Sequence, residues 1–526
     1  MSYFCYSVYM EYEAVIGLEI HAELKTKTKM FCQSLNDPLE LHPNVNVCPV
    51  CMAHPGTLPV INKDAVKKVI AVGLALNGEI PEFSQFDRKH YFYPDLPKGY
   101  QISQYEHPLV SGGYLDIESN SDDEDNKFPI SNFQFPNKSQ TANSKDQKMT
   151  IKRIRITRVH LEEDTGRLSH DPASGSSLVD FNRAGVPLME LVTEPDFRTG
   201  KEVIAFGEEL QKILRYVGAS DADMEKGQMR VEVNISLRPK GSETYGTKVE
   251  VKNINSFKYA ADAAAYEYTR QKELREAGET IVQETRGWNE TKGQSISQRK
   301  KESAHDYCYF PEPDLPPLHI SREMVEQIKA KLPELPAQKR NRFEKEYLLD
   351  ASMAGVICHD KAFAEYFEET ISELGQHAKE AGEEPHSNLA KIAAGFMTRD
   401  FMRLLSEKSA SVREVLIQPE NLAELVFFVA DNKISHLAAK EVLEEMFEKG
   451  DDPSDIIDRR GLWQISDALE LEDMARLVIE RHPEEVRTIR NGKTATLQFL
   501  VGQVMKESRG KANPKIVQEI LRKIIG

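Results

Sequence analysis

Alternating apolar and polar residues, the pattern of half-buried β-strands, recur in the first 320 residues of the chain. Residues 14–24, 151–164 and 228–237 show this period of two. Residues 201–218 and 259–278 instead carry apolar residues at helical spacing and end in glycine, as helices commonly do. Because the strands and helices do not alternate regularly, the pattern predicts an α+β region with a mainly antiparallel sheet.

The pattern changes at Ser321, after which amphipathic runs rich in Ala, Leu, Glu and Lys predict an all-α helical domain. Asp452-Pro453 predicts a boundary before a small α-helical tail domain, in which Asn513 can cap a helix that begins at Pro514. One polar stretch has too few aliphatic residues to offset its ordering entropy and is typical of a loop inserted between two strands. The predicted parts are an N-terminal extension (1–11), an α+β domain (12–320) with a low-complexity insertion (117–148), a helical domain (321–452) and the tail domain (453–526).

Composition narrows the class of protein. The chain has 526 residues, more than the roughly 250–300 that one core usually serves, so several domains are expected. No run approaches the roughly 18 apolar residues of a membrane span, the start makes a poor signal peptide, and six cysteines exclude a disulfide scaffold. These features predict a cytoplasmic protein without a membrane partner. The net charge of −16 argues against general affinity for nucleic acid.

The sign of the charge reverses at the C-terminal end. Residues 486–526 contain nine Lys and Arg against two Glu, a net of +7. A solvated helix face and a docking surface for a polyanion both explain this reversal, and the sequence leaves the two open.

Acidic side chains lie on several predicted strands. Glu19, His21 and Glu23 share one face of a strand, which suits either a divalent metal site or an ordinary exposed sheet face. The segment His160-Leu161-Glu162-Glu163-Asp164 and the isolated Glu232 add carboxylates from two further strands. Acids gathered from separate strands are what a magnesium–nucleotide site needs, because Mg²⁺ takes few protein carboxylates together with phosphates and water.

Two further segments carry candidate chemistry. Arg88, Lys89 and Lys98 lie among aromatic residues, in a loop that either binds phosphates and a base or packs on the core. No Walker A loop, GxGxxG, kinase catalytic loop or nucleophile elbow is present, so any ATP site has another architecture.

Cys48 and Cys51 form a CxxC, and Cys32 precedes them. Three thiolates with a fourth ligand, such as His42 or His54, would hold a structural zinc ion, and an unmetallated thiol cluster is the alternative.

Taken together, the motifs resemble one family, the B subunits of glutamine-dependent aspartyl/glutamyl-tRNA amidotransferases. The resemblance covers nearly the whole chain apart from residues 1–11 and 117–148. It is carried by VIGLEIHAELKTKTKMF, NVCPVCMAHPGTLPVIN, FDRKHYFYPDLPKGYQISQ, HLEEDTGR, DFNRAGVPLMELVTEPD, EVKNINSF, AHDYCYFPEPDLPPL and FLVGQVMKESRGKANP.

The resemblance implies a fold and a reaction. The α+β part would be a cradle related to the glutamine synthetase catalytic domain, followed by the helical and tail domains. ATP would phosphorylate the side-chain carboxylate of Glu on tRNA(Gln) or of Asp on tRNA(Asn), and ammonia would displace the phosphate. A separate amidase (the A subunit) would supply ammonia through a channel, and a small protein (the C subunit) would complete a heterotrimer. A tRNA-binding assembly scaffold without chemistry is the alternative.

The resemblance also implies roles for single residues. Glu19 and His21 would hold one Mg²⁺, and Glu162, Glu163 and Glu232 would be shared between metal and nucleotide phosphates. Glu19, His21 and Glu163 are the implied catalytic residues. The implied phosphate or substrate contacts are Arg88, Lys89 and Lys98, and the implied tRNA contacts are Lys493, Lys506, Arg509 and Lys511.

The chain departs from the family pattern at two positions. Members that bind zinc carry Cys-x-Cys before the CxxC, but Ser34 takes the place of the second thiol, so the set of Cys32, Cys48 and Cys51 is one thiolate short. Many relatives have Asp where this chain has Glu232, which keeps the carboxylate on a longer side chain.

Overall fold

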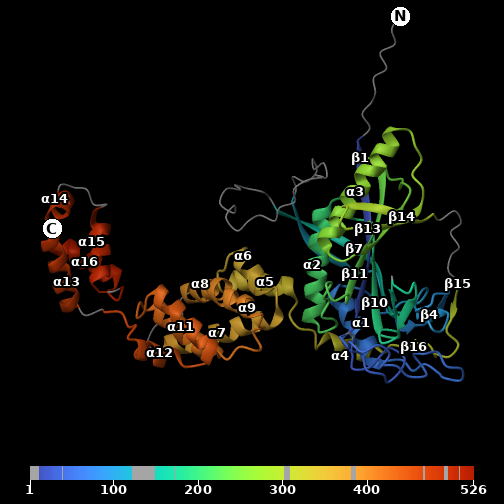
Figure 1. Cartoon of the computed structure of the whole chain (residues 1–526), viewed down its shortest axis with the longest axis horizontal. Helices are drawn as coiled ribbons and strands as arrows, with labels where there is room; N and C mark the ends of the chain where they lie inside the picture. The colour runs from blue at the N-terminus through green and yellow to red at the C-terminus, as the bar shows by residue number, and fades with distance from the viewer. Residues whose placement is uncertain are drawn as a thin grey trace, which may run out of the picture. The chain divides into compact units, whose positions relative to one another are not determined.

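A computed structural model describes residues 11–37, 39–120, 149–171, 173–300, 308–380, 387–465, 468–490, 496–508 and 510–526. The chain divides into two compact units, Met1–Leu335 and Pro336–Gly526 (Figure 1). The first unit is a mainly antiparallel sheet with helices, and the second unit is all-helical, as the sequence pattern predicts.

The described strands of the first unit include a nine-stranded sheet in the order β14-β13-β12-β11-β1-β10-β7-β5, with β6 also paired to β7. All its pairs are antiparallel except β12–β13. The central strand β1 pairs with β11 and β10, which come from distant parts of the sequence. The strands are β1 (Tyr12–Glu23), β5 (Val110–Ser111), β6 (Tyr114–Asn120), β7 (Met149–Glu163), β10 (Pro187–Thr193), β11 (Met229–Pro239), β12 (Val249–Ile254), β13 (Glu284–Asn289) and β14 (Gln294–Lys300).

The two faces of this sheet differ in chemistry because side chains alternate along each strand. Leu18, Ile20 and Ala22 of β1 are buried in a core with three helices, α1 (Lys63–Ala75), α2 (Gly200–Tyr216) and α3 (Phe257–Glu276). Glu19 and His21 lie on the opposite face. Helices α1 and α3 are capped by Asn62 and Ser256, whose side chains accept hydrogen bonds from backbone N–H groups of the first turn. Helix α2 begins with a capping box.

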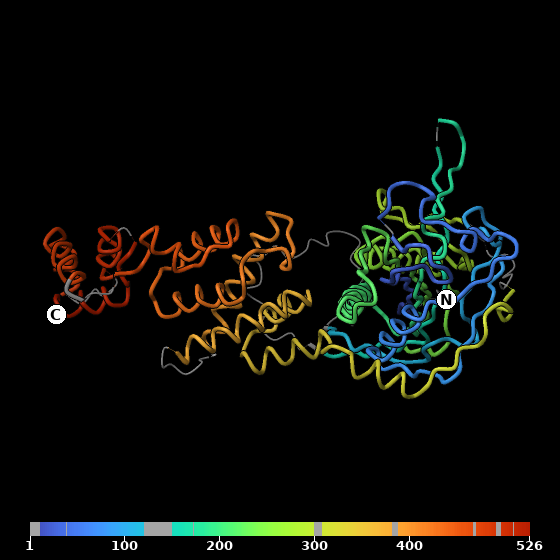
Figure 2. Tube along the Cα trace, turned by 90° about the horizontal axis from the view of Figure 1, so that it is seen from below, coloured from blue at the N-terminus to red at the C-terminus, as the bar shows by residue number. Residues whose placement is uncertain are grey.

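Short strands form three small sheets beside the large one among the described residues of the first unit. In both Figure 1 and Figure 2, α2 lies on one side of the first unit and β4 and β15 lie on the other. The short strands are β2 (Phe83–Ser84), β3 (Asp87–His90), β4 (Tyr100–Ser103), β8 (Arg167–His170), β9 (Ser177–Asp180), β15 (Cys308–Pro311) and β16 (Leu318–His319).

The polar stretch predicted as an insertion interrupts a β-hairpin. Strand β6 ends at Asn120, which pairs with Met149 at the start of β7. Ile117 is buried within β6, so the strand continues past the predicted start of the insertion. Residues 121–148 and most of the N-terminal extension lie outside the described residues.

The first unit extends beyond the change in composition at residue 320. Helix α4 (Arg322–Lys329) packs Met324, Val325 and Ile328 against the core of the first unit. The boundary between the compact units falls at Leu335 and Pro336.

The second unit has two hydrophobic cores among its described residues. One includes buried residues from Phe343 to Ile457, and the other includes residues from Leu471 to Ile525. Asn513 caps the last helix and Pro514 occupies its first turn, as predicted. The helical segments are α5 (Pro336–Glu346), α6 (Ala351–Ile357), α7 (Lys361–Glu380), α8 (Ser387–Phe396), the π-helical η2 (Met397–Phe401), α9 (Met402–Lys408), α10 (Pro419–Ala430), α11 (His436–Lys449), α12 (Pro453–Arg460), α13 (Ala468–Arg481), α14 (Pro483–Arg490), α15 (Leu497–Glu507) and α16 (Pro514–Ile525).

Candidate functional site

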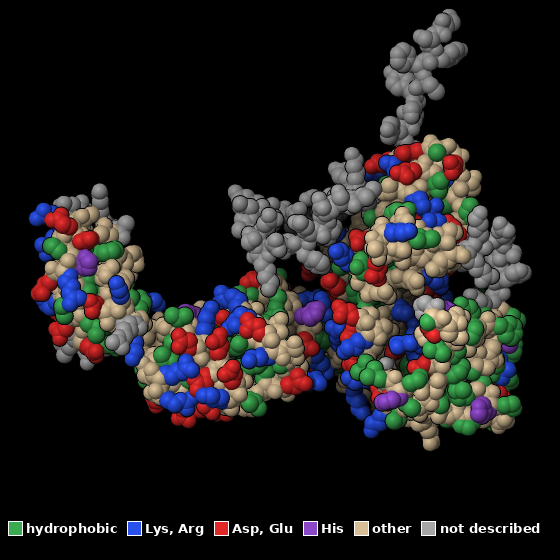
Figure 3. All heavy atoms as spheres, in the orientation of Figure 1, with side chains coloured by type: hydrophobic (Ala, Val, Ile, Leu, Met, Phe, Trp, Pro, Cys, Tyr) green, Lys and Arg blue, Asp and Glu red, His purple; other side chains and the backbone are tan. Residues whose placement is uncertain are grey.

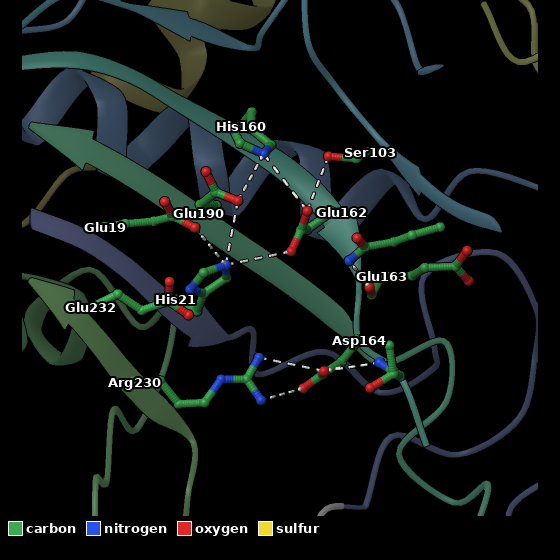
Figure 4. A network of polar contacts seen from close by, with 12 residues as sticks. Glu19, His21, Ser103, His160, Glu162, Glu163, Asp164, Glu190, Arg230 and Glu232 are labelled. Atoms are coloured by element: carbon green, nitrogen blue, oxygen red, sulfur yellow. Dashed lines mark hydrogen bonds and ion pairs between the residues drawn. The ribbon is translucent and has the colours of Figure 1, made fainter. Parts of the chain in front are cut away.

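Acidic and histidine side chains converge at the centre of the polar face of the large sheet (Figure 4). Strand pairing places Glu232 of β11 directly opposite Glu19 of β1, and Glu190 of β10 directly opposite His21. On β7, Glu162 projects from the same face. We call Glu19, His21, Glu162, Glu190 and Glu232 the acidic cluster.

His21 lies in the middle of the acidic cluster. Its Nε2 atom is 3.3 Å from Glu190 Oε2 and 3.7 Å from both Glu19 Oε1 and Glu162 Oε1. A second histidine, His160, bridges two of the same carboxylates from β7, with its Nε2 atom 3.4 Å from Glu190 Oε2 and 3.7 Å from Glu162 Oε2. The cluster is therefore built from four strands that only the sheet brings together.

The carboxylates shift one another's proton affinities. Burial and the charges of Glu190 and Glu232 raise the pKa of Glu19 to about 7. Burial opposes protonation of His21, but its hydrogen bond with Glu190 and the charges of Glu190 and Glu162 raise its pKa to about 9. Negative charge from the neighbouring carboxylates contributes to both shifts, and such a concentration of negative charge favours a proton or a cation.

The donor set fits a divalent metal ion. Two overlapping groups, Glu19–His21–Glu232 and His21–Glu162–Glu190, each offer three ligand atoms that lie within 4.8 Å of one another. Among the described residues, His21 Nδ1 is one of the buried side-chain atoms without a hydrogen-bond partner. Carboxylate oxygens are the ligands that Mg²⁺ prefers, and an imidazole broadens the choice toward borderline metals.

Glu163 projects away from the acidic cluster, because it is adjacent to Glu162 on an extended strand. Its Oε1 atom is 2.5 Å from Lys98 Nζ and accepts a hydrogen bond from the backbone N–H of Ile102. Both charged residues line a cavity of about 250 Å³ that Cys51 also lines. The structure therefore does not bring Glu163 and Lys98 to the predicted metal site.

Of the other predicted phosphate contacts, only Lys89 lies near the acidic cluster. The charges of Glu162 and Glu190 raise the pKa of Lys89, although burial opposes this. Arg88 instead forms a bidentate ion pair with Glu312, at 2.7 and 2.8 Å.

Cys32, Cys48 and Cys51 come together, with sulfur atoms that lie within 4.8 Å of one another. Cys51 Sγ is 3.8 Å from both Cys48 Sγ and the buried ammonium of Lys29, and 3.9 Å from Ser34 Oγ. Hydrogen bonding to Cys32, a backbone hydrogen bond from Cys48 and the charge of Lys29 together lower the pKa of Cys51 to about 4, whereas burial acts against the shift. The three thiols are arranged as ligands for a soft metal ion, and Ser34 lies beside one of them, Cys51.

Two of the predicted tRNA contacts can be located. Lys506 is exposed near the end of α15, and Lys511 is half-buried before α16. Lys493 and Arg509 lie outside the described residues. None of the described helices is both long and apolar enough to cross a membrane.

Reasoning from sequence did not select Glu190, and it assigned no role to His160. Glu190 stands in the run Pro187–Thr193, whose other residues are apolar except for the terminal threonine. The sequence does carry a signal for Glu190, which is a single carboxylate at the centre of an apolar strand. A buried charge of this kind needs a charged partner or a metal ion.

The chain matches two family models, which together cover most of its length. The "GatB/GatE catalytic domain" model matches residues 14–326, and the "GatB domain" model matches residues 365–525. These ranges include the acidic cluster and most of both cores of the second unit.

Bacterial relatives match the chain from end to end. A protein of Caldicellulosiruptor saccharolyticus is 47% identical over 98% of this chain and 99% of its own length. Proteins of Crocosphaera subtropica (44% identical, 98% of each chain) and Thermodesulfovibrio yellowstonii (45% identical, 98% of this chain and 100% of its own) are similar. All three are named as the B subunits of aspartyl/glutamyl-tRNA(Asn/Gln) amidotransferases. This chain therefore belongs to the family of aspartyl/glutamyl-tRNA(Asn/Gln) amidotransferase B subunits.

Proposed function

We propose that the acidic cluster is the site at which ATP phosphorylates the side-chain carboxylate of a misacylated tRNA. The substrates would be Glu-tRNA(Gln), Asp-tRNA(Asn) or both. Ammonia would then attack the acyl phosphate, release phosphate and leave Gln-tRNA(Gln) or Asn-tRNA(Asn). The family supports an amidotransferase, and the convergence of carboxylates on one sheet face is the observation that carries the assignment of this step.

The proposed chemistry explains why the site consists of charges. A carboxylate reacts poorly with ammonia because it has no good leaving group, whereas an acyl phosphate has one. Phosphoryl transfer depends mainly on positioning and on stabilising charge. Bound Mg²⁺ would neutralise charge on the transferred phosphoryl group.

Within the acidic cluster, the two overlapping groups suggest a division of work. Glu19, His21 and Glu232 would hold one metal ion. Glu162 and Glu190 would either hold a second ion together with His21 or face the nucleotide phosphates. His160 would keep Glu162 and Glu190 in position, since it lies between their carboxylates. Lys89 would offset the charge of the phosphates from the neighbouring strand β3.

Glu163 and Lys98 suit a different role. Their ion pair lines a separate cavity, so we propose that they shape the approach to the site, with no part in holding metal. Arg88 would stabilise the fold through Glu312.

The larger assembly follows from the family. We propose that an amidase supplies ammonia from glutamine, that a small third protein joins the complex, and that tRNA lies along the basic C-terminal segment. In this proposal residues 12–320 form the glutamine-synthetase-like cradle, residues 321–452 the helical domain and residues 453–526 the tRNA-binding tail.

Replacing Glu190 tests the proposed site. In the complex with the amidase and the small third protein, Glu190→Gln is expected to lower glutamyl-tRNA-dependent ATP hydrolysis and amide formation at least about 100-fold, because the cluster loses a central charge. Binding of tRNA should persist, and thermal unfolding should show a folded protein.

Glu13→Gln is the matched control, because Glu13 lies on the same face of β1 but pairs with Arg238, away from the cluster. It should retain near-normal rates. A normal rate of amide formation in Glu190→Gln would contradict the proposal and would favour the non-catalytic scaffold.

A further inference from the structure

Three cationic side chains border the acidic cluster on the same face of the sheet. Arg158 precedes His160 by two positions on β7, and Arg230 of β11 lies directly opposite His21. Lys252 of β12 reaches Glu232, with its Nζ atom 2.8 Å from Glu232 Oε2. The cluster is therefore flanked by positive charge on both sides.

Strand pairing shows how this border is laid out. Arg158 lies opposite Val192, Val192 lies opposite Glu19, and Glu19 lies opposite Glu232. Arg158 and Glu232 are thus separated by three strand spacings, or about 14 Å. Lys252 stands beyond Glu232, so two long cationic side chains lie at opposite ends of one row with the carboxylate of Glu19 between them.

These cations remain accessible. The side chains of Arg158, Arg230 and Lys252 are 30%, 37% and 39% exposed, whereas that of Lys98, which was expected to contact phosphate, is 14% exposed. The contacts of the two arginines are also loose. Arg158 Nη2 is 3.7 Å from Glu190 Oε1, and Arg230 Nη2 is 3.4 Å from Asp164 Oδ1, both longer than the usual 2.7–2.9 Å of a charge-assisted hydrogen bond.

A nucleotide polyphosphate needs such groups. Its several negative charges would be repelled by the acidic cluster wherever no cation intervenes. A metal ion held by the carboxylates can neutralise only part of the phosphate charge. The remaining phosphate oxygens need hydrogen-bond donors beside the cluster. Guanidinium and ammonium groups are the side chains best suited to phosphate.

We propose that Arg158, Arg230 and Lys252 bind the phosphate groups of the nucleotide and hold them over the acidic cluster. The inference rests on the proposed function and deepens it, because it assigns the phosphate contacts to residues that the sequence did not indicate. Arg88 and Lys98, which the resemblance implied, have side chains that are only 19% and 14% exposed and that pair with the buried carboxylates of Glu312 and Glu163.

Binding of Mg·ATP to the full-length chain, measured by calorimetry, tests the proposal. Arg158→Gln, Arg230→Gln and Lys252→Met should each weaken binding at least about tenfold. Inorganic tripolyphosphate should compete with ATP on the wild-type chain and compete at least about tenfold less well on the variants. Arg158→Lys and Lys252→Arg keep the positive charge and should bind Mg·ATP more tightly than Arg158→Gln and Lys252→Met. This partial recovery would show that the loss of affinity comes from the lost charge and not from misfolding.

Arg238→Gln is the matched control, since Arg238 lies on β11 on the same face as Arg230 but pairs with Glu13. Its affinity for Mg·ATP should stay within twofold of wild type. Unchanged affinity in the three test variants would overturn the inference, and so would a loss confined to tRNA binding. In either case, loss of phosphoryl transfer in Glu190→Gln would leave the proposed function standing, so the two failures are distinguishable.

Discussion

Glu162 and Glu163 are neighbours in the sequence with the same functional group, yet they have different surroundings. Glu162 faces His21 and His160 and accepts a hydrogen bond from Ser103. Glu163 turns to the opposite side and pairs with Lys98. The alternation of side chains along a strand makes this separation unavoidable. A run of acids therefore predicted a site but could not say which acid belongs to it.

The cysteine cluster shows how one side chain can decide whether a metal is held. Ser34 Oγ is 3.9 Å from Cys51 Sγ, so position 34 lies at the edge of the thiol cluster. We expect Ser34→Cys to complete a four-thiolate set and to raise the bound zinc toward one equivalent per chain, because tetrahedral thiolate sites suit zinc.

The measurement is zinc content by mass spectrometry after dialysis against a mild chelator. Ser2→Cys, in the N-terminal extension, is the control for an added thiol and should leave the zinc content unchanged. Equal zinc contents in Ser34→Cys and the unmodified chain would contradict the expectation.

At the scale of elements, the repeating patterns were informative. Strands β1, β7 and β11 and helices α2 and α3 occur where the period of two or the helical spacing predicts them. Their partners could not be read in the same way, because pairing of β1 with β10 and β11 joins segments that lie far apart in the chain. The acidic cluster depends on that pairing.

Helix α10 carries a carboxylate that should make stability depend on pH. Burial and the nearby charges of Asp452, Glu420 and Asp455 raise the pKa of Glu424 from 4.5 to about 7. Because the folded protein binds this proton more tightly than the unfolded chain, its contribution to stability falls as pH rises from about 4.5 to 7.

Glu424→Gln should therefore stabilise the protein by about 1 kcal/mol at pH 8, allowing for partial solvent screening, and by close to nothing at pH 4. Urea unfolding at the two pH values measures the difference. Glu448→Gln, at an exposed position on α11, should show no such dependence. An equal effect of Glu424→Gln at both pH values would contradict the assigned pKa.

At the scale of the whole molecule, charge is distributed unevenly. On the face seen in Figure 3, acidic and basic side chains are intermixed over the second unit. Many are paired, as in the ion pairs of Arg403 with Glu444 and of Arg460 with Glu445. In the last segment of the sequence, by contrast, basic residues outnumber acidic ones.

If this segment binds tRNA as proposed, its lysines should set the salt dependence of binding. Lys506→Gln and Lys511→Gln should each weaken tRNA binding a few-fold and lower the slope of log affinity against log salt by about 1. Filter binding at several salt concentrations measures both quantities. Lys379→Gln on α7 is the control, and a slope unaffected by Lys506→Gln and Lys511→Gln would exclude these lysines from the tRNA contact.

The sequence by itself determined the class of each region, because the spacing of apolar residues directly reflects which face of a strand or helix is buried. It also determined the family, through long motifs that span the chain, and it supplied four of the five members of the acidic cluster. Only the tertiary structure added Glu190, separated Glu163 from Glu162, and showed that Arg88 and Lys98 already have buried partners. Those outcomes depend on which strands pair and in which register, and such long-range contacts leave no periodic trace in the residues that make them.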